Sequence, residues 1–221
     1  MSFISHRLFP IILFVLAVNA SHADVTRKET ASFCQANCIS PYGMVLGASS
    51  GGVEAYSNCR PECKAYVPNK WKGTFTGVKW QCVEYARRWL LINNGAVYGE
   101  VDTAADIWEK VDHLTHVATQ KKLPLETHLN GSEKPPRRGD LLVYARAFYD
   151  TGHVAVVTDV DHENGVIEVA EQNFNNQPWA ADYARTIEFV KKGDSYWLLD
   201  GYLLGWKHVK DQHTEIEAKV D

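Results

Sequence analysis

One cysteine stands apart from the other four in this chain. Cys82 lies in the stretch VKWQCVEYARRWLLINNG, residues 78–95, and the others precede it. From Cys82 onward apolar residues recur at helical spacing, which predicts a helix that begins at Cys82 and ends at Asn94–Gly95. A helix N-terminus carries a partial positive charge that stabilises a thiolate. Cys82 is therefore a candidate nucleophile, and a buried, inert cysteine on the apolar stripe is the alternative.

A histidine and two possible partners for its ring lie in the stretch DTGHVAVVTDVDHENGVIEVAEQN, residues 150–173. The pattern predicts two antiparallel strands joined near residues 162–165, so that the numbers of facing residues add up to about 324 or 326. His153 then faces either Glu171 or Asn173. Because side chains alternate along a strand, all three share one face in both registers, and a slip of one residue would separate them. A thiol, a base and a group that orients the base are the parts of a cysteine hydrolase.

The N-terminus has the composition of a secretory signal. His6 and Arg7 precede an apolar run from Leu8 to Val18, and "NASHAD" then offers small residues for a cleavage site. The run is too short for a membrane-spanning helix, which needs about 20 apolar residues. We therefore expect residues 1–23 to be a cleaved signal peptide and the protein to be periplasmic or secreted, without membrane contact after cleavage.

If the protein is exported, the four upstream cysteines can form disulfides, because disulfides persist in oxidising compartments. They form two Cys-x-x-x-Cys pairs, Cys34 with Cys38 and Cys59 with Cys63. Four cysteines allow three connectivities, and two helical turns packed antiparallel would join Cys34 to Cys63 and Cys38 to Cys59. A metal site is the alternative for this spacing. Under either interpretation Cys82 is the odd cysteine.

The remaining pattern predicts the elements that must position these residues. Residues 43–58, GMVLGASSGGVEAYSN, indicate a β-hairpin, and its Gly-x-Ser-x-Gly match at 47–51 is interpreted as a turn rather than a serine hydrolase elbow. A second helix is predicted from Thr103 to Leu114, followed by strands over residues 140–145, 153–160, 166–173 and 196–208. Helices first and antiparallel strands after predict an α+β fold.

Composition sets the frame for the whole chain. With 221 residues, 45% of them hydrophobic and 23% charged, one core domain is expected. A formal net charge of −4 gives no reason to expect a nucleic acid partner. We expect a cysteine-rich segment including the hairpin at 24–64, a catalytic core at 65–210 and a polar tail at 211–221. The histidines show no recognisable metal-ligand pattern, and a monomer is expected.

Four blocks of the sequence resemble the CHAP family of cysteine amidases and peptidases, which has an NlpC-type, papain-like fold. The blocks are KWQCVEYARRWL, DTGHVAVVT, AEQN and LLGW, and they occur in the order of the family within residues 43–208. Within the family they resemble most the amidase domain of bifunctional glutathionylspermidine synthetase/amidases and its trypanothione counterpart. The resemblance implies that N-terminal helices, with the cysteine at a helix start, pack on an antiparallel sheet.

The resemblance also implies a role for each candidate residue. These are the nucleophile Cys82, the base and then acid His153, the orienting carboxylate Glu171, the oxyanion-hole residue Gln81, the supporting residue Asn173 and the substrate-binding residue Arg87. The implied activity is hydrolysis of an amide bond through a thioester acyl-enzyme, without metal or organic cofactor. The substrate is either a glutathionylspermidine-like amide or a peptide bond of peptidoglycan. A non-catalytic binding domain of the same fold is the alternative from another class.

Overall fold

The computed structural model describes residues 34–210, so the predicted signal peptide and polar tail lie outside the described residues. The described chain forms two helices and thirteen strands. No helix within residues 34–210 is long and apolar enough to cross a bilayer. The elements are β1 (Val45–Ser49), β2 (Val53–Tyr56), β3 (Val67–Trp71), β4 (Thr74–Lys79), α2 (Cys82–Asn94), β5 (Ala96–Val97), α3 (Asp106–Lys110), β6 (His113–His116), β7 (Lys122–Leu129), β8 (Leu141–Tyr144), β9 (Val154–Asp161), β10 (Val166–Ala170), β11 (Arg185–Lys192), β12 (Ser195–Leu198) and β13 (Leu203–Val209).

Nine strands form one antiparallel sheet, in the order β12-β11-β10-β9-β8-β13-β7-β6-β5. Because side chains alternate across a strand, β8 and β9 supply residues to two hydrophobic cores. The two sets are Leu141, Val143, Val154 and Val156, which pack with α2 and α3, and Leu142, Tyr144, Ala155 and Val157, which pack with strands β10–β13. The sheet therefore has a core on each face. The mixed content of a few helices and a mostly antiparallel sheet agrees with the predicted α+β class.

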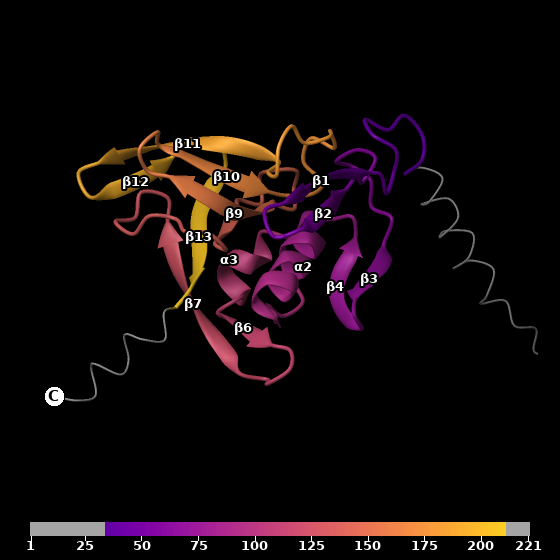
Figure 1. The fold of residues 1–221 in the computed structure, drawn as a ribbon, viewed down its shortest axis with the longest axis horizontal. Helices are drawn as coiled ribbons and strands as arrows, with labels where there is room; N and C mark the ends of the chain where they lie inside the picture. The colour runs from indigo at the N-terminus through magenta and orange to yellow at the C-terminus, as the bar shows by residue number, and fades with distance from the viewer. Residues whose placement is uncertain (1–33, 211–221) are drawn as a thin grey trace, which may run out of the picture.

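Helix α2 spans the residues that the sequence pattern predicts. It buries Tyr85, Ala86, Trp89 and Leu90 in the first core. It ends at Gly95, which has a left-handed backbone (φ 65°) and donates its N–H to the carbonyl of Leu91. Figure 1 shows α2 between the β3–β4 hairpin and the strands of the large sheet. The cysteine at its start is thereby placed between these two bodies of the fold.

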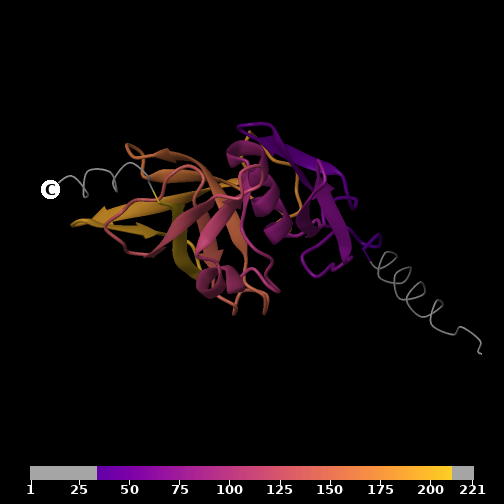
Figure 2. The same ribbon diagram turned by 90° about the horizontal axis from the view of Figure 1, so that it is seen from below.

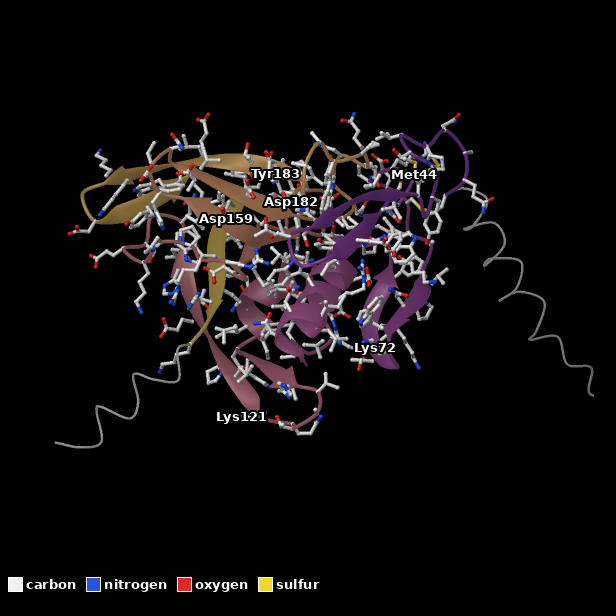
Figure 3. The ribbon with its side chains drawn as sticks, viewed as in Figure 1. Met44, Lys72, Lys121, Asp159, Asp182 and Tyr183 are labelled. Carbon is white, nitrogen blue, oxygen red and sulfur yellow. A yellow bond between two sulfur atoms is a disulfide. The ribbon has the colours of Figure 1, made fainter. Side chains whose placement is uncertain are left out.

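The β1–β2 hairpin confirms the prediction for residues 43–58, and the Gly-x-Ser-x-Gly match lies on β1 and its turn. Trp89 donates its ring N–H to the hydroxyl of Ser49 at 3.2 Å. Ser50 donates its backbone N–H to the carbonyl of Asp182 at 3.1 Å, and Asp182 is labelled in Figure 3 next to Tyr183. These contacts join the turn to α2 and to the segment before β11, as expected for a structural element.

Three predictions of the fold need correction. Four strands precede α2, so the order is not helices first and strands after. The predicted helix over 103–114 is only α3, because Val111 turns extended and residues 113–116 pair with β7 as strand β6. The predicted strand over 196–208 is two strands, β12 and β13, separated by a turn in which Tyr202 has a left-handed backbone (φ 65°). Tertiary strand pairing overrides the local pattern in these places.

Strands β3, β4, β5, β7 and β11 have no counterpart in the sequence predictions. The β3–β4 hairpin turns at Lys72, which Figure 3 labels. The view in Figure 2 shows the cysteine-rich segment and the small hairpins at one end of the molecule and the large sheet at the other. Helix α2 contacts both ends, and the β1–β2 hairpin also bonds directly to the segment before β11.

Candidate active site

A cavity of about 650 Å³ opens beside the N-terminus of α2. Cys82 and His153 both line it, together with Gln81, Arg87 and Asn173. Four further segments contribute to its wall, from residues 61–66, 75–78, 100–104 and 149–152. The structure thus brings five of the sequence candidates to one cavity. The sixth, Glu171, lies behind His153.

Cys82 is the first residue of α2 and is 8% exposed. All five cysteines lie in the described part of the chain, and Cys82 is the one outside the disulfides. Gln81 has an extended backbone, and its side chain makes no capping hydrogen bond to the helix. The N–H groups of the first helical turn have no acceptor inside the helix, so they remain available to an anion.

His153 and Glu171 form a buried pair. The Nε2 atom of His153 lies 2.8 Å from Oε2 of Glu171, and both side chains are 2% exposed. Burial alone would lower the pKa of His153, but the charge of Cys82, a hydrogen bond to it and the contact with Glu171 raise this pKa to about 9. Burial likewise opposes ionisation of Glu171, yet its contacts with His153 and with Arg185 hold its pKa below the usual range. The pair favours an imidazolium beside a carboxylate.

A β-bulge brings this pair onto one face. Near the turn of the β9–β10 hairpin the numbers of facing residues add up to 327, as for Val166 and Asp161. A register shift after Glu168 changes the sum to 326, as for Val169 and Val157. The even sum predicted from the sequence therefore holds at the site end of the hairpin and is wrong at the turn end. Without the bulge, His153 and Glu171 would point to opposite faces.

The carboxamide of Gln81 is fixed at both ends. Its Oε1 accepts a hydrogen bond from Asn173 at 2.9 Å, and its Nε2 donates one to the carbonyl of Cys63 at 3.0 Å. Since an amide nitrogen has two hydrogens, one remains for another acceptor. Asn173, which has a left-handed backbone (φ 56°), donates its side-chain amide to Gln81, whereas the His153 ring contacts Glu171. Asn173 and Glu171 therefore have different partners in the site: Asn173 holds Gln81, and Glu171 contacts His153.

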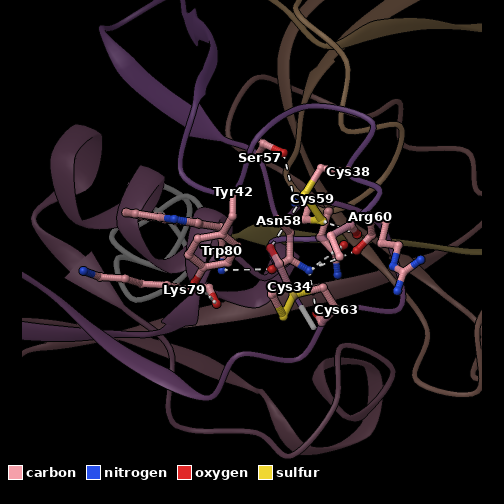
Figure 4. The surroundings of a disulfide bond; sticks show 12 residues. Cys34, Cys38, Tyr42, Ser57, Asn58, Cys59, Arg60, Cys63, Lys79 and Trp80 are labelled. Carbon is pink, nitrogen blue, oxygen red and sulfur yellow. Dashed lines mark hydrogen bonds between the residues drawn. A yellow bond between two sulfur atoms is a disulfide. The ribbon is translucent and has the colours of Figure 1, made fainter. Parts of the chain in front are cut away.

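A hydrogen bond connects the disulfide-bonded, cysteine-rich segment to the side-chain amide of Gln81. The disulfides are Cys34–Cys63 and Cys38–Cys59, the connectivity that two antiparallel turns would give. Asn58, fully buried, donates to the carbonyl of Cys63 at 2.6 Å and accepts from the N–H of Trp80 at 3.5 Å (Figure 4). The same Asn58 amide donates to Asn173 at 3.0 Å. The disulfide-bonded segment is therefore part of the scaffold that positions Gln81.

A second buried carboxylate, Glu84, lies on α2. Arg88 donates to it twice, at 2.8 and 3.2 Å, and Asn69, Thr76 and Gln172 donate to it at 2.8, 2.9 and 3.1 Å. Both side chains of the Glu84–Arg88 pair are at most 3% exposed. The sequence spacing predicts the pair but not its burial. The network ties α2 to β3, β4 and the segment after β10.

Arg87 is buried beside the cavity, with its guanidinium 5.6 Å from the ring centres of both Phe75 and Tyr98. Its Nη2 donates to the carbonyl of Phe75 at 3.2 Å. Its Nε is buried and finds no acceptor within residues 34–210. Burial lowers its pKa, although a guanidinium keeps its charge in proteins. The residue offers a positive donor to an anionic group of a bound molecule.

Sequence reasoning missed a group of residues behind Glu171. Arg185 donates to Oε1 of Glu171 at 2.6 Å and to Asp200 at 2.8 Å. The alternation of buried Ile187 and Phe189 after Arg185 could have indicated the strand. It could not have indicated that the arginine binds Glu171. Among the described residues, no group of three or more His, Cys, Asp or Glu side chains could hold a metal ion.

Part of the chain matches a known protein family. Residues 73–173 match the family described as CHAP domain. The chain is 34% identical over 194 residues to bifunctional glutathionylspermidine synthetase/amidase of Escherichia coli K12, covering 79% of this chain and 30% of that protein. Trypanothione synthetase of Crithidia fasciculata is 32% identical over 161 residues, which are 72% of this chain and 24% of that protein. The chain therefore spans less than a third of the length of these relatives.

Proposed function

We propose that this chain, which belongs to the CHAP family of cysteine amidases and peptidases, hydrolyses an amide bond through a thioester between Cys82 and the acyl group of its substrate. The observation that carries the proposal is the geometry beside the cavity: a cysteine at a helix start and a buried His153–Glu171 pair. A binding domain without turnover would not need a buried histidine with a pKa of about 9.

In the first half of the reaction, His153 takes the proton of Cys82, and the thiolate attacks the amide carbonyl. Nε2 of His153 is bound to Glu171, so Nδ1 is the ring nitrogen that serves the thiol. The C–N bond then breaks as His153 gives the proton to the leaving amine, and the acyl group stays on sulfur. In the second half, His153 activates a water that hydrolyses the thioester and regenerates the thiol. Glu171 stabilises the imidazolium in both halves.

The oxyanion of each tetrahedral intermediate would bind the backbone N–H of Cys82 and the remaining hydrogen of the Gln81 amide. Both donors are fixed before substrate arrives, the first by α2 and the second by Asn173 and Cys63. Preorganised donors of this kind contribute about 3 kcal/mol each in other hydrolases. Asn173 is thus a support for Gln81, and Arg87, which lines the cavity, would bind an anionic part of the substrate.

The substrate we favour is a glutathionylspermidine-like amide. The E. coli relative is named as a glutathionylspermidine synthetase/amidase, and a cavity of about 650 Å³ has the size of a small-molecule site. A peptide bond of peptidoglycan is the second candidate. The observation in its favour is the pair of disulfides, which are typical of exported proteins. They support the periplasmic or secreted location and the signal peptide over residues 1–23 that the sequence predicts.

One experiment separates the substrates. Residues 24–221, produced with both disulfides formed, are incubated with glutathionylspermidine and, in parallel, with purified peptidoglycan, and the released amines or peptides are identified by mass spectrometry. The Cys82→Ala variant is the control for enzyme-dependent release. We expect spermidine from the first substrate. Release of wall peptides alone would favour the second candidate, and no release from either, with Cys82 also unreactive toward a thiol probe, would overturn the proposal.

A further inference from the structure

Arg185, on β11, holds one of the two oxygens of Glu171. Its Nε donates to Oε1 at 2.6 Å, and His153 contacts Oε2 at 2.8 Å. Each oxygen of the carboxylate therefore has its own partner, and rotation of the carboxylate would break a bond to a charged group. Arg185 lies beyond residue 173, where the match to the CHAP domain ends.

Four groups hold the guanidinium of Arg185. Besides Glu171, it donates through Nη1 to Asp200 at 2.8 Å and through Nη2 to the hydroxyl of Tyr144 at 3.1 Å. That hydroxyl donates to the same oxygen of Asp200 at 2.7 Å. The guanidinium also lies 4.4 Å from the ring centre of Phe174. A planar fork bound at all three nitrogens has one orientation.

The strand register explains why these groups meet. Arg185 faces Val169 across β10 and β11, and Val169 faces Val157 across β10 and β9. Glu171 is two residues beyond Val169, so it lies on the same face and diagonal to Arg185. The arrangement is thus set by the main chain rather than by two flexible surface side chains.

We propose that Arg185 is a positioning residue of the site: by occupying Oε1 of Glu171 it presents Oε2 to Nε2 of His153, and so keeps the other ring nitrogen available to Cys82. The inference rests on the proposed function. Arg185 is not among the described residues that line the cavity, so it acts through Glu171 and not on the substrate. Asp200 and Tyr144 hold Arg185 in place from the other side.

The charge of Arg185 has a second effect. The ionisable groups that face Glu171 are His153 before β9, Tyr144 on β8, Tyr85 on α2, Arg185 on β11 and, through Arg185, Asp200 after β12. Burial would raise the pKa of Glu171, and the contacts with His153 and Arg185 reverse this. Loss of the positive charge would favour the protonated forms of both Glu171 and His153. The pH range in which the site is active should then move upward at both limits.

The test is the Arg185→Met variant, which keeps the bulk of the side chain and removes its charge and hydrogen bonds. Two readouts are measured against pH: the rate at which iodoacetamide alkylates Cys82, and kcat and KM for the substrate identified as above. We expect the midpoint of the alkylation profile to move to higher pH. We expect kcat to fall by about tenfold to a hundredfold, as for other misplaced catalytic groups, with KM nearly unchanged.

Two further variants make the result interpretable. Arg185→Lys keeps the charge without the fork, so it should return the alkylation midpoint toward that of the wild type and recover only part of kcat. Arg146→Met is the matched control, because Arg146 is 55% exposed and pairs with Asp106 at 2.9 Å. It should leave both readouts unchanged. Circular dichroism and thermal unfolding confirm that each variant is folded. If Arg185→Met is not folded, Arg185→Gln, which removes the charge but keeps hydrogen-bonding groups, carries the test, and its alkylation midpoint should also move to higher pH.

The outcomes separate this inference from the proposed function. An Arg185→Met alkylation profile that superimposes on the wild type overturns the positioning role, whatever happens to turnover. A shifted profile in a protein that hydrolyses neither substrate supports the positioning role and counts against the proposed function. A fall in kcat that Arg185→Lys does not recover, without a change in the pH profile, indicates a structural role only and overturns the inference.

Discussion

Two buried carboxylates, Glu84 and Glu171, each accept hydrogen bonds from an arginine, but their other partners differ in kind. Glu84 binds the amides of Asn69 and Gln172 and the hydroxyl of Thr76, which do not titrate. Glu171 binds the ring of His153, which gains and loses a proton. A buried acid among groups of fixed charge serves to hold segments together. A buried acid beside a titratable ring can stabilise a proton that comes and goes.

The two clusters also differ in where their arginine comes from. Arg88 is four residues from Glu84 on the same helix, and its pair is sealed, with side chains 3% and 0% exposed. Arg185 is on another strand than Glu171 and is 20% exposed. The first cluster should therefore govern stability and the second activity. Variants of the Glu171 cluster should therefore lose activity, and variants of the Glu84 cluster should lose stability.

The largest effect is expected at Cys82, which the Glu171 cluster serves. In Cys82→Ser the hydroxyl is isosteric with the thiol at the helix start but lacks its accessible ionisation, so turnover should fall by about 10⁴-fold or more. The thermal midpoint should move by only a few degrees. Steady-state assays and calorimetry on the same preparation check both parts. Full activity, or an unfolded variant, would mean that Cys82 is structural.

The next effect is expected for Glu171→Gln. The charged donor Arg185 should claim the amide oxygen, which turns the NH₂ group toward His153 and forces the wrong tautomer on its ring. A wrong tautomer costs about 10⁴-fold in a serine protease, and we expect a loss of about 10³-fold here. The thermal midpoint should fall less than in variants of Glu84.

The double variant Glu171→Gln/Arg185→Met tests that explanation. Without the charged donor the amide can rotate and offer its oxygen to His153, so the double variant should be more active than Glu171→Gln alone, by about tenfold. A double variant that is less active than both single ones contradicts the orientation argument. If Glu171→Gln is silent and Asn173→Ala is severe, the third member of the site is Asn173 and the roles assigned here are wrong.

Glu84→Gln should instead lower stability. It leaves the guanidinium of Arg88 buried without its counter-charge, and breaking such a pair costs about 3 kcal/mol or more. Urea unfolding measures the loss, and Glu109→Gln, an exposed change on α3, is the control. Activity per folded molecule should stay close to that of the wild type. A large fall in activity without a loss of stability would remove the distinction between the two carboxylates.

The sequence predicts the parts of the site whose geometry is local or periodic. The helix from Cys82 follows from its apolar stripe, and the shared face of His153 and Glu171 follows from the period of two along a strand. Even there the result depends on a bulge after Glu168 that no pattern indicates. The period fixes relative faces over a few residues, whereas a bulge depends on how two strands twist together.

The rest of the site depends on contacts between distant segments. Glu84 and Arg88 have the spacing of an exposed helical pair, and only the packing of β3 and β4 against α2 buries them. Arg185 is charged and follows a connection without a periodic pattern, so nothing in its local sequence separates it from a surface residue. The helix predicted over 103–114 fails for the same reason, because Leu114 is buried in strand β6 rather than on a helix face.

The smallest predicted effect is a change in one titration, and it distinguishes the two carboxylates most directly. His153 has a pKa of about 9 because the charge and hydrogen bond of Cys82 and the contact with Glu171 outweigh burial, which lowers it. Its ring should therefore be an imidazolium at pH 7.5, and turnover should be lost as the pH rises through about 9.

In Cys82→Ala the charge of Cys82, which is the largest cause that raises the pKa of His153, is gone, so this pKa should fall below that of the wild type. Glu84→Gln, measured where it is folded, should leave the titration unchanged. The pKa of His153 is measured in the wild type, in Cys82→Ala and in Glu84→Gln from the imidazole ¹⁵N chemical shifts as a function of pH. A His153 titration that responds to Glu84→Gln but not to Cys82→Ala would show that the charge of the histidine is set by the structural cluster and not by the thiol.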